Sequence, residues 1–244
     1  MSTYLYGIVS DSHPKELAGL RGIGKRPAPL RKVAAGDLAV VVSDVPADIR
    51  AKRRDLLAHE TVLEALCDQG PTLPMRFGVI ADDDESIAQE VSAEQERYQR
   101  LLSYLNGRVE INVKVKHNDE ALLRAVLADH ESLTRMNEDL RRQGGGDHDD
   151  RVRFGEMVAR AVDEREQRDA VKIISGLAAH AIRETAGTGI SGYFVNHSFL
   201  VDREYLPEFS SAVQELRESA GEYVEVRTRG PLPPYSFTDT ADVI

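Results

Sequence analysis

The chain has 244 residues, enough for one large domain or two small ones with a buried core. Acidic residues outnumber basic ones by 41 to 31, and the formal net charge of −10 argues against a general nucleic-acid binder. The single cysteine, Cys67, excludes an internal disulfide and a four-thiolate zinc or iron–sulfur site. Short apolar runs and the lack of a targeting pattern at the start predict a soluble, cytoplasmic protein that does not enter a membrane.

The chain opens with strand patterns. Residues 4–9 form an aromatic and β-branched run that is typical of a strand. Residues 15–29 are rich in glycine and proline and predict a loop. A Gly-Asp turn separates residues 30–33 from residues 38–43, which indicates a hairpin. The second strand of that hairpin is apolar at nearly every position, so we expect it to be buried on both faces.

A helix, a strand and another helix are predicted next. Apolar residues recur at three-, four- and seven-residue spacing over residues 48–67, as in an amphipathic helix. Residues 73–80 predict one strand, and the carboxylates after it suit the amino end of a second helix that reaches about Leu105. This order favours an α+β fold, and we predict a ferredoxin-like N-terminal domain over residues 1–105.

The middle of the chain is predicted to be mostly helical. Residues 107–116 alternate apolar and polar side chains and give the clearest strand pattern in the sequence. Two helical stretches follow, at residues 118–142 and 151–184. A glycine-rich linker near residues 143–150 separates them, and we expect it to be flexible and mobile.

The end of the chain repeats a strand, helix, strand order. These elements are expected at residues 193–201, 207–219 and 223–229, and a proline-rich tail, residues 230–244, completes the chain. We therefore predict that residues 106–244 form a second α+β domain with a long helical insertion.

Two glycine-rich motifs resemble nucleotide-binding loops but stand in the wrong context. Residues 19–26 match the phosphate-loop spacing, yet Arg26 replaces the hydroxyl residue that holds Mg²⁺, and Pro27 follows where a helix must begin. We interpret this segment as a surface loop. Residues 187–192 fit G-x-G-x-x-G, but a helix is predicted before them and a strand after them, and we expect Gly187 to end that helix.

Candidate metal and catalytic residues also lack support. His59 and Glu60 begin like a zinc motif, but Leu63 occupies the second histidine position. We expect His59 on the polar flank of its helix, with a partner contact as the alternative, and Cys67 as a buried apolar residue. Residues 147–150 predict a solvated loop. No catalytic, cofactor-binding or metal-binding residue is predicted. A basic cluster precedes His59 and consists of Arg50, Lys52, Arg53 and Arg54. We interpret it as a solvated helix face, with a contact to an acidic partner as the alternative.

Several segments, taken in order, resemble the gas vesicle protein family GvpF/GvpL. The resemblance spans nearly the whole chain. It rests on residues 4–9, 41–46, the helix with His59-Glu60, 73–78, 110–115 and the closing segment 230–237. The family commonly has Trp between the first two prolines of the closing segment, whereas this chain has Leu232 and keeps an apolar residue without the aromatic anchor.

The resemblance implies a non-enzymatic accessory or minor structural component of gas vesicles, the protein-walled organelles that give microbes buoyancy. It implies binding to the hydrophobic main shell protein (GvpA-type) and to other accessory proteins during nucleation and assembly, and a limit on shell-protein aggregation. It also implies a ferredoxin-like N-terminal domain, an α+β C-terminal domain and no cofactor. Two alternatives stay open: a ferredoxin-like small-molecule-binding regulatory protein, and a hydrolase or nucleotide enzyme.

The closing segment is predicted to be ordered. Its prolines restrict the backbone, and its apolar side chains supply area that a solvated terminus does not need. We expect it to pack on the N-terminal domain and to fix the relative placement of the domains, with an exposed partner-binding strip as the alternative. The structural or interaction candidates are therefore Arg76, Phe77, Pro231, Leu232, Pro233, Pro234, Tyr235 and Phe237.

Overall fold

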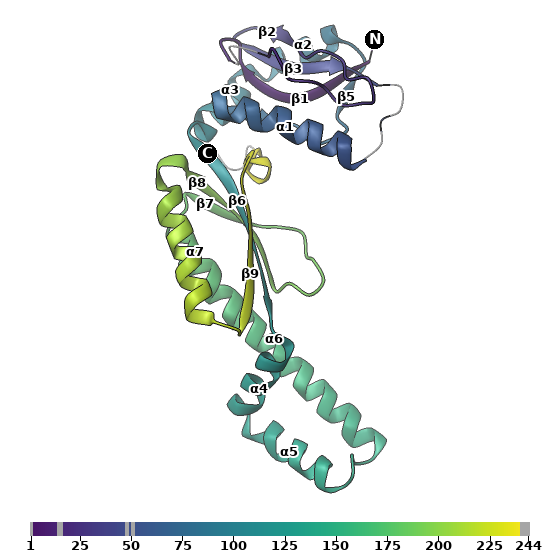
Figure 1. The fold of residues 1–244 in the computed structure, drawn as a ribbon, viewed down its shortest axis with the longest axis vertical. Helices are drawn as coiled ribbons and strands as arrows, with labels where there is room; N and C mark the ends of the chain where they lie inside the picture. Colours follow the sequence, from purple (N-terminus) through teal and green to yellow (C-terminus); the bar gives the residue numbers. More distant parts are fainter. Residues whose placement is uncertain (1, 14–16, 47–48, 50–51, 240–244) are drawn as a thin grey trace. The chain divides into compact units, whose positions relative to one another are not determined.

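The computed structural model describes residues 2–13, 17–46, 49 and 52–239. The chain divides into two compact units (Figure 1). The first comprises Met1–Ile111 and Gly230–Ile244, and the second comprises Asn112–Arg229. The closing segment, assigned from the sequence to the second domain, thus groups with the first unit, because its described contacts are with residues of that unit.

The first unit is built on an antiparallel sheet. Its strands are β1 (Thr3–Ser10), β2 (Arg31–Ala35), β3 (Leu38–Asp44), β4 (Thr72–Pro74) and β5 (Ile80–Ala81). They lie in the order β2-β3-β1-β4, and β5 also pairs with β1. This is the ferredoxin-like strand order, and it confirms that prediction. β3 lies between β2 and β1, and its residues 38–43 are all buried, so both of its faces are covered as predicted.

The predicted strand over residues 73–80 is wrong as a single element. β4 ends at Pro74, and the chain turns through Gly78, whose φ is +94°, before β5 begins. A proline cannot donate to the next ladder bond, and the left-handed conformation at Gly78 favours glycine. The sequence therefore carried the signals for the break.

Helices α1 (Arg53–Gln69), α2 (Asp84–Ala93) and α3 (Gln95–Leu105) complete the first unit. Residues 48 and 50, from which the helix and its basic cluster were expected to start, lie outside the described residues. The capping role predicted for the carboxylates before α2 is confirmed, because the Asp83 side chain accepts a hydrogen bond from the Ser86 N–H at 2.8 Å. The single helix predicted from these carboxylates to about Leu105 is broken at Glu94 into α2 and α3. This break lets α2 pack on β2 while α3 packs on β4.

The second unit contains a second antiparallel sheet. Its sheet has the order β7-β8-β6-β9. The strands are β6 (Arg108–His117), β7 (Arg183–Ala186), β8 (Val195–Asp202) and β9 (Val224–Leu232), of which β6 and β9 carry the chain between the two units.

Helices α4 (Asp119–Asp129), α5 (Glu131–Arg142) and α6 (His148–Ala178) form the predicted helical insertion (Figure 1). The helix expected over residues 118–142 is divided at His130, whose backbone is extended. This division lets the chain turn back so that the three helices share one apolar core, formed by Leu122, Val126, Leu133 and Ala161. The 3₁₀ turn η1 (Arg203–Tyr205) leads into the last long helix, α7 (Leu206–Ala220).

The linker between α5 and α6 is a hydrogen-bonded turn. The three glycines at 144–146 have positive φ, and the Gly145 N–H donates to the Leu140 carbonyl at 2.8 Å. The Asp147 carboxylate then caps α6 through the Asp150 N–H at 2.8 Å. Helix α6 thus begins before the expected residue 151, and the mobility of the linker stays a prediction.

Helix α6 also ends earlier than predicted. It stops at Ala178, and residues 183–186 form β7, which pairs with β8. The prediction that Gly187 ends the helix is therefore wrong. Gly187 follows β7, its φ is not positive, and a Cβ there would meet the Asn196 side chain at 2.6 Å. The glycine-rich motif at 187–192 lies in a hairpin between two strands, where no helix N-terminus can hold a phosphate.

Candidate functional site

A buried cluster of rings lies at the centre of the first unit, and we call it the Tyr-His cluster: Tyr4, Tyr6, His59 and Phe77. Helix α1 places His59 against β1, where its Nδ1 lies 2.9 Å from the Tyr4 hydroxyl and its Nε2 lies 2.9 Å from the Met75 carbonyl oxygen. The Met75 carbonyl can only accept, so Nε2 donates to it and Nδ1 accepts from Tyr4. The His59 ring also stacks on Tyr6 at 5.4 Å between centroids.

Burial decides the charge state of this cluster. His59 is 3% exposed, so its predicted place on the polar flank of the helix is wrong, and a partner contact is equally excluded in this conformation. Burial lowers the pKa of His59 and raises the pKa of both Tyr4 and Tyr6. The three groups are therefore neutral at pH 7. Cys67, on the same helix, is half-buried and not fully buried as expected.

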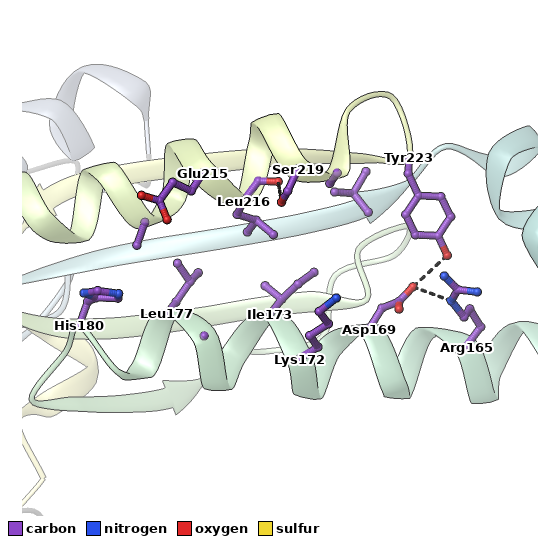
Figure 2. Close-up of a pocket in the computed structure, with 14 residues that line it drawn as sticks. Arg165, Asp169, Lys172, Ile173, Leu177, His180, Glu215, Leu216, Ser219 and Tyr223 are labelled. Atoms are coloured by element: carbon purple, nitrogen blue, oxygen red, sulfur yellow. Dashed lines mark hydrogen bonds and ion pairs between the residues drawn. The ribbon is translucent and has the colours of Figure 1, made fainter.

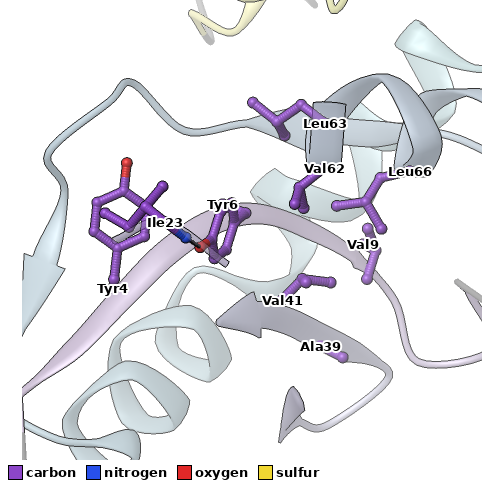
Figure 3. Close-up of a cluster of buried hydrophobic side chains, with 9 residues drawn as sticks. All are labelled: Tyr4, Tyr6, Val9, Ile23, Ala39, Val41, Val62, Leu63 and Leu66. Atoms are coloured by element: carbon purple, nitrogen blue, oxygen red, sulfur yellow. Dashed lines mark hydrogen bonds between the residues drawn. The ribbon is translucent and has the colours of Figure 1, made fainter. Parts of the chain in front are cut away.

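The glycine-rich loop of residues 19–26 is packed onto this cluster. The Ile23 N–H donates to the Tyr6 hydroxyl at 2.9 Å, and the Gly24 N–H donates to the Asp55 carboxylate at 3.0 Å. The Ile23 side chain lies in the core beside Tyr6 (Figure 3) and is 1% exposed. A phosphate loop needs such N–H groups for its ligand. Here protein acceptors use them, and the predicted surface loop is in fact anchored in the core.

The closing segment is anchored to the first unit by a buried carboxylate. After β9 the chain forms the 3₁₀ turn η2 (Tyr235–Phe237). The Ser236 N–H and hydroxyl donate to the two oxygens of Glu110 at 2.9 and 2.8 Å, and Glu110 is 4% exposed. Phe237 is fully buried. The segment is therefore held by paired polar contacts as well as by apolar packing.

The residues singled out from the sequence fall into three groups by burial. Pro233, Pro234 and Phe237 are buried, Phe77, Leu232 and Tyr235 are half-buried, and Arg76 and Pro231 are exposed. The structure brings Phe77 and Tyr235 to the same apolar core, formed around Tyr4, Tyr6 and Leu63. Residues 240–244, part of the predicted tail, lie outside the described residues.

A second polar cluster lies in the second unit, and we call it the Asp169 cluster: His117, Arg165, Asp169 and Tyr223. One Asp169 oxygen, Oδ2, accepts from the Tyr223 hydroxyl at 2.9 Å and from Arg165 Nε at 3.0 Å (Figure 2), and it lies 3.0 Å from His117 Nε2. Burial alone would raise the pKa of Asp169, but these three contacts outweigh it and hold that pKa below its usual range. Burial and the Asp169 carboxylate raise the pKa of Tyr223 to about 12.

The Asp169 cluster closes one end of a groove between α6 and α7. The groove has a volume of about 540 Å³, and Ile173, Leu177 and Leu216 supply its apolar lining, with Lys172 and Glu215 at its rim (Figure 2). The cluster ties α6 to the end of β6 and to the residue before β9. Arg165 also pairs with Asp129 at 2.8 Å, and the buried His117 Nδ1 lies 3.8 Å from a Glu166 carboxylate oxygen, beyond hydrogen-bond distance. Among the described residues, no group of three or more metal-ligating side chains is placed to hold a metal ion.

Neither cluster was predicted, because both join residues far apart in sequence. Tyr4 and His59 are 55 positions apart, and Asp169 and Tyr223 are 54 apart. No spacing rule within one helix or strand connects such residues. The one signal in the sequence was the period-2 pattern of β6, which places His117 on the same face as Val115 and so indicates that His117 is buried.

Comparison with known proteins identifies the family. The model of the family described as gas vesicle synthesis protein GvpL/GvpF matches residues 2–239. The chain belongs to this family. The resemblance noted in the sequence is thereby confirmed, and GvpL/GvpF membership supports an accessory role in gas vesicles.

Relatives in this family match over almost the whole chain. Gas vesicle protein F from Streptomyces sp. (strain CB03234) is 42% identical over 239 residues, covering 98% of this chain and all of the relative. Gas vesicle protein L from the same strain is 28% identical, covering 98% of this chain and 93% of the relative.

The fold is that of solved GvpF structures. The crystal structure of GvpF from Microcystis aeruginosa superposes with a TM-score of 0.77 at 24% identity, covering 98% of this chain and 99% of that chain. The structure from Anabaena sp. PCC7120 gives 0.82 at 22% identity, with 98% of each chain covered. Across the described part of this GvpL/GvpF chain, none of the helices combines the length and apolarity needed to span a bilayer.

Proposed function

We propose that this protein is a non-enzymatic accessory or minor structural component of gas vesicles in the cytoplasm. In this role it binds the hydrophobic main shell protein and other accessory proteins during nucleation and assembly, and it limits the aggregation of the shell protein. The observation that carries the proposal is the family match, which runs from residue 2 to residue 239.

An apolar surface on α1 supports contact with a hydrophobic partner. Leu56 is 40% exposed and Leu57 is 50% exposed, although they are neighbours on a helix that packs into the core through Val62, Leu63 and Leu66. Adjacent large apolar side chains in water favour contact with apolar surface elsewhere. Three basic residues precede them, Lys52, Arg53 and Arg54, of which Arg54 is paired with Asp55 at 2.9 Å.

Substitution on this surface tests the binding role. We expect Leu56→Gln/Leu57→Gln to keep the melting temperature of the protein and to weaken its binding to immobilised shell protein at least about tenfold, since each leucine loses apolar contact. The matched control is Leu123→Gln/Val171→Gln, which changes two exposed apolar residues of the second unit. If both double variants bind the shell protein equally well, the contact with the shell protein does not lie at Leu56 and Leu57. No binding by the unmodified protein would refute the proposed function.

The regulatory alternative has less support. A small-molecule regulatory domain requires a pocket in which polar groups converge. In the structure the polar groups that converge beside a groove are those of the Asp169 cluster, and they belong to the second unit and not to the ferredoxin-like unit.

A further inference from the structure

β9 forms one end of the sheet in the second unit. In the strand order β7-β8-β6-β9, its hydrogen-bonded neighbour is β6, so among the described residues its other edge terminates the sheet. The side chains at position 225 and at positions 227–229 are exposed. An edge strand of this kind presents main-chain N–H and C=O groups that another strand can pair with.

The two strands at this edge carry more basic than acidic side chains, although the chain has a net charge of −10. Lys116 lies 2.8 Å from the Glu225 carboxylate, and Arg227 also contacts that carboxylate. These two side chains hold the pKa of Glu225 below its usual range, so the one acidic group is ionised and already paired. Residues 112–117 and 224–229 contain one acidic and four basic side chains: Glu225, Lys114, Lys116, Arg227 and Arg229.

A further cation reaches the same edge from α7. The Arg217 guanidinium donates to the Thr228 hydroxyl at 3.2 Å and to the Val226 carbonyl at 3.4 Å. Charged side chains on an edge strand prevent pairing with another edge of the same charge. They also attract a strand of opposite charge, because like charges repel and complementary charges steer association.

We propose that the β9 edge binds an extended acidic segment of a partner protein as an added strand. Main-chain hydrogen bonds to β9 supply the binding once the added strand displaces Arg217 from the Val226 carbonyl. Carboxylates on the added strand then compete with Glu225 for Lys116 and Arg227 and pair with the released Arg217. A second copy of this chain paired through β9 would bring the same cations together. The phosphates of a lipid or a nucleic acid would pair with the basic side chains but would not form main-chain hydrogen bonds along β9. The proposal is independent of shell-protein binding.

A labelled peptide tests this proposal on the full-length protein. We expect a fluorescein-labelled peptide of alternating Glu and Val to bind at low salt and an alternating Lys and Val peptide not to bind, as measured by fluorescence anisotropy. The Glu–Val peptide with every second amide N-methylated keeps its charge but loses the donors along one edge, and it should bind at least about tenfold more weakly. Hydrogen exchange of the amides of residues 224–229 should slow when the unmethylated peptide binds.

Charge reversal supplies the second arm of the test. Arg217→Glu/Arg227→Glu should weaken binding of the Glu–Val peptide at least about tenfold. The matched control, Arg153→Glu/Arg160→Glu, makes the same charge change at exposed positions of α6 and should alter affinity less than about twofold. Arg227→Gln, a milder change, should give an intermediate loss if the double variant does not fold. No binding of the Glu–Val peptide, equal binding of the methylated or Lys–Val peptide, or equal losses in both double variants would overturn the proposal.

Discussion

His59 places an ionisable ring inside an apolar core, and its contacts select the neutral form. The Met75 carbonyl fixes the proton on Nε2, and the Tyr4 hydroxyl satisfies Nδ1. A protonated ring would put a second donor opposite a hydroxyl that already accepts from the Gly78 N–H at 3.2 Å. Charge on His59 therefore costs both solvation and a hydrogen bond.

Acid should destabilise the protein through this residue. Burial lowers the pKa of folded His59 below the unfolded value of about 6.5, so the unfolded chain takes up the proton first as pH falls. The contribution to stability is complete above about pH 6.5 and decreases below it. We expect the melting temperature to fall less between about pH 7 and 5 in His59→Gln than in the unmodified protein.

His148 provides the control for this measurement, because it is exposed at the start of α6. His148→Gln should retain the pH dependence of the unmodified protein. Burial also lowers the pKa of His13, so the slope in His59→Gln should decrease without disappearing. The same slope in all three proteins would show that His59 does not carry the effect.

The Ser236 hydroxyl should contribute measurably to stability. It donates at 2.8 Å to the buried carboxylate of Glu110. Hydrogen bonds to charged groups are worth about 1.5–3 kcal/mol, and because Ser236 itself is exposed, Ser236→Ala should lower the free energy of unfolding by roughly the lower end of that range. Ser92→Ala, at an exposed helical position, is the control and should change stability little. A loss no larger than that of the control would mean that water replaces the hydroxyl.

At the scale of elements, the closing segment joins a strand end to the core of the first unit. β9 continues to Leu232, and η2 then directs Phe237 inward, where it is fully buried. Two prolines, Pro233 and Pro234, restrict the chain between these points, so less conformational entropy is lost when the segment docks. The segment therefore belongs to the folded unit.

Deletion of residues 231–244 should lower the melting temperature of the isolated protein. Truncation of a buried Phe alone costs about 3–5 kcal/mol, and the deletion also leaves the Glu110 carboxylate without its Ser236 donors. Phe237→Ala should reproduce most of the loss. Unchanged stability together with lost shell-protein binding would instead favour the exposed partner-binding strip.

Much of the fold follows from local patterns, and the exceptions have a common cause. The hairpin of β2 and β3 was predictable because the turn and the apolar runs lie within fifteen residues of each other. The helix breaks at Glu94 and His130 have no glycine or proline to announce them. β7 was missed because its four residues gain their structure from β8 and not from their own propensity.

The candidate sites were less predictable than the fold. The closing segment was expected to pack near Arg76 and Phe77. Phe77 shares an apolar core with Tyr235, whereas Arg76 is exposed. The Glu110 anchor was not foreseen, because a carboxylate in an alternating strand is usually solvated and its partner lies 126 positions away. Buried polar pairs of this kind depend on tertiary contacts that a single sequence does not reveal.

At the scale of the whole molecule, the glycine-rich motifs give no nucleotide site. The N–H groups at 23 and 24 are used by Tyr6 and Asp55, and the motif at 187–192 lies between two strands. We therefore expect Mg-ATP, Mg-GTP and NAD to leave the melting temperature unchanged in a thermal-shift measurement. A rise that increases with nucleotide concentration would contradict this, since a ligand of the native state must stabilise it.

We propose that this GvpL/GvpF chain binds the main shell protein and limits its aggregation. The most direct measurement is sedimentation of the shell protein, diluted from denaturant with and without the full-length chain. We predict that the chain keeps shell protein in the supernatant and co-sediments with it in a gradient, and that Leu56→Gln/Leu57→Gln loses both effects. Shell protein that pellets equally with and without the chain, with no complex in the gradient, would contradict this role.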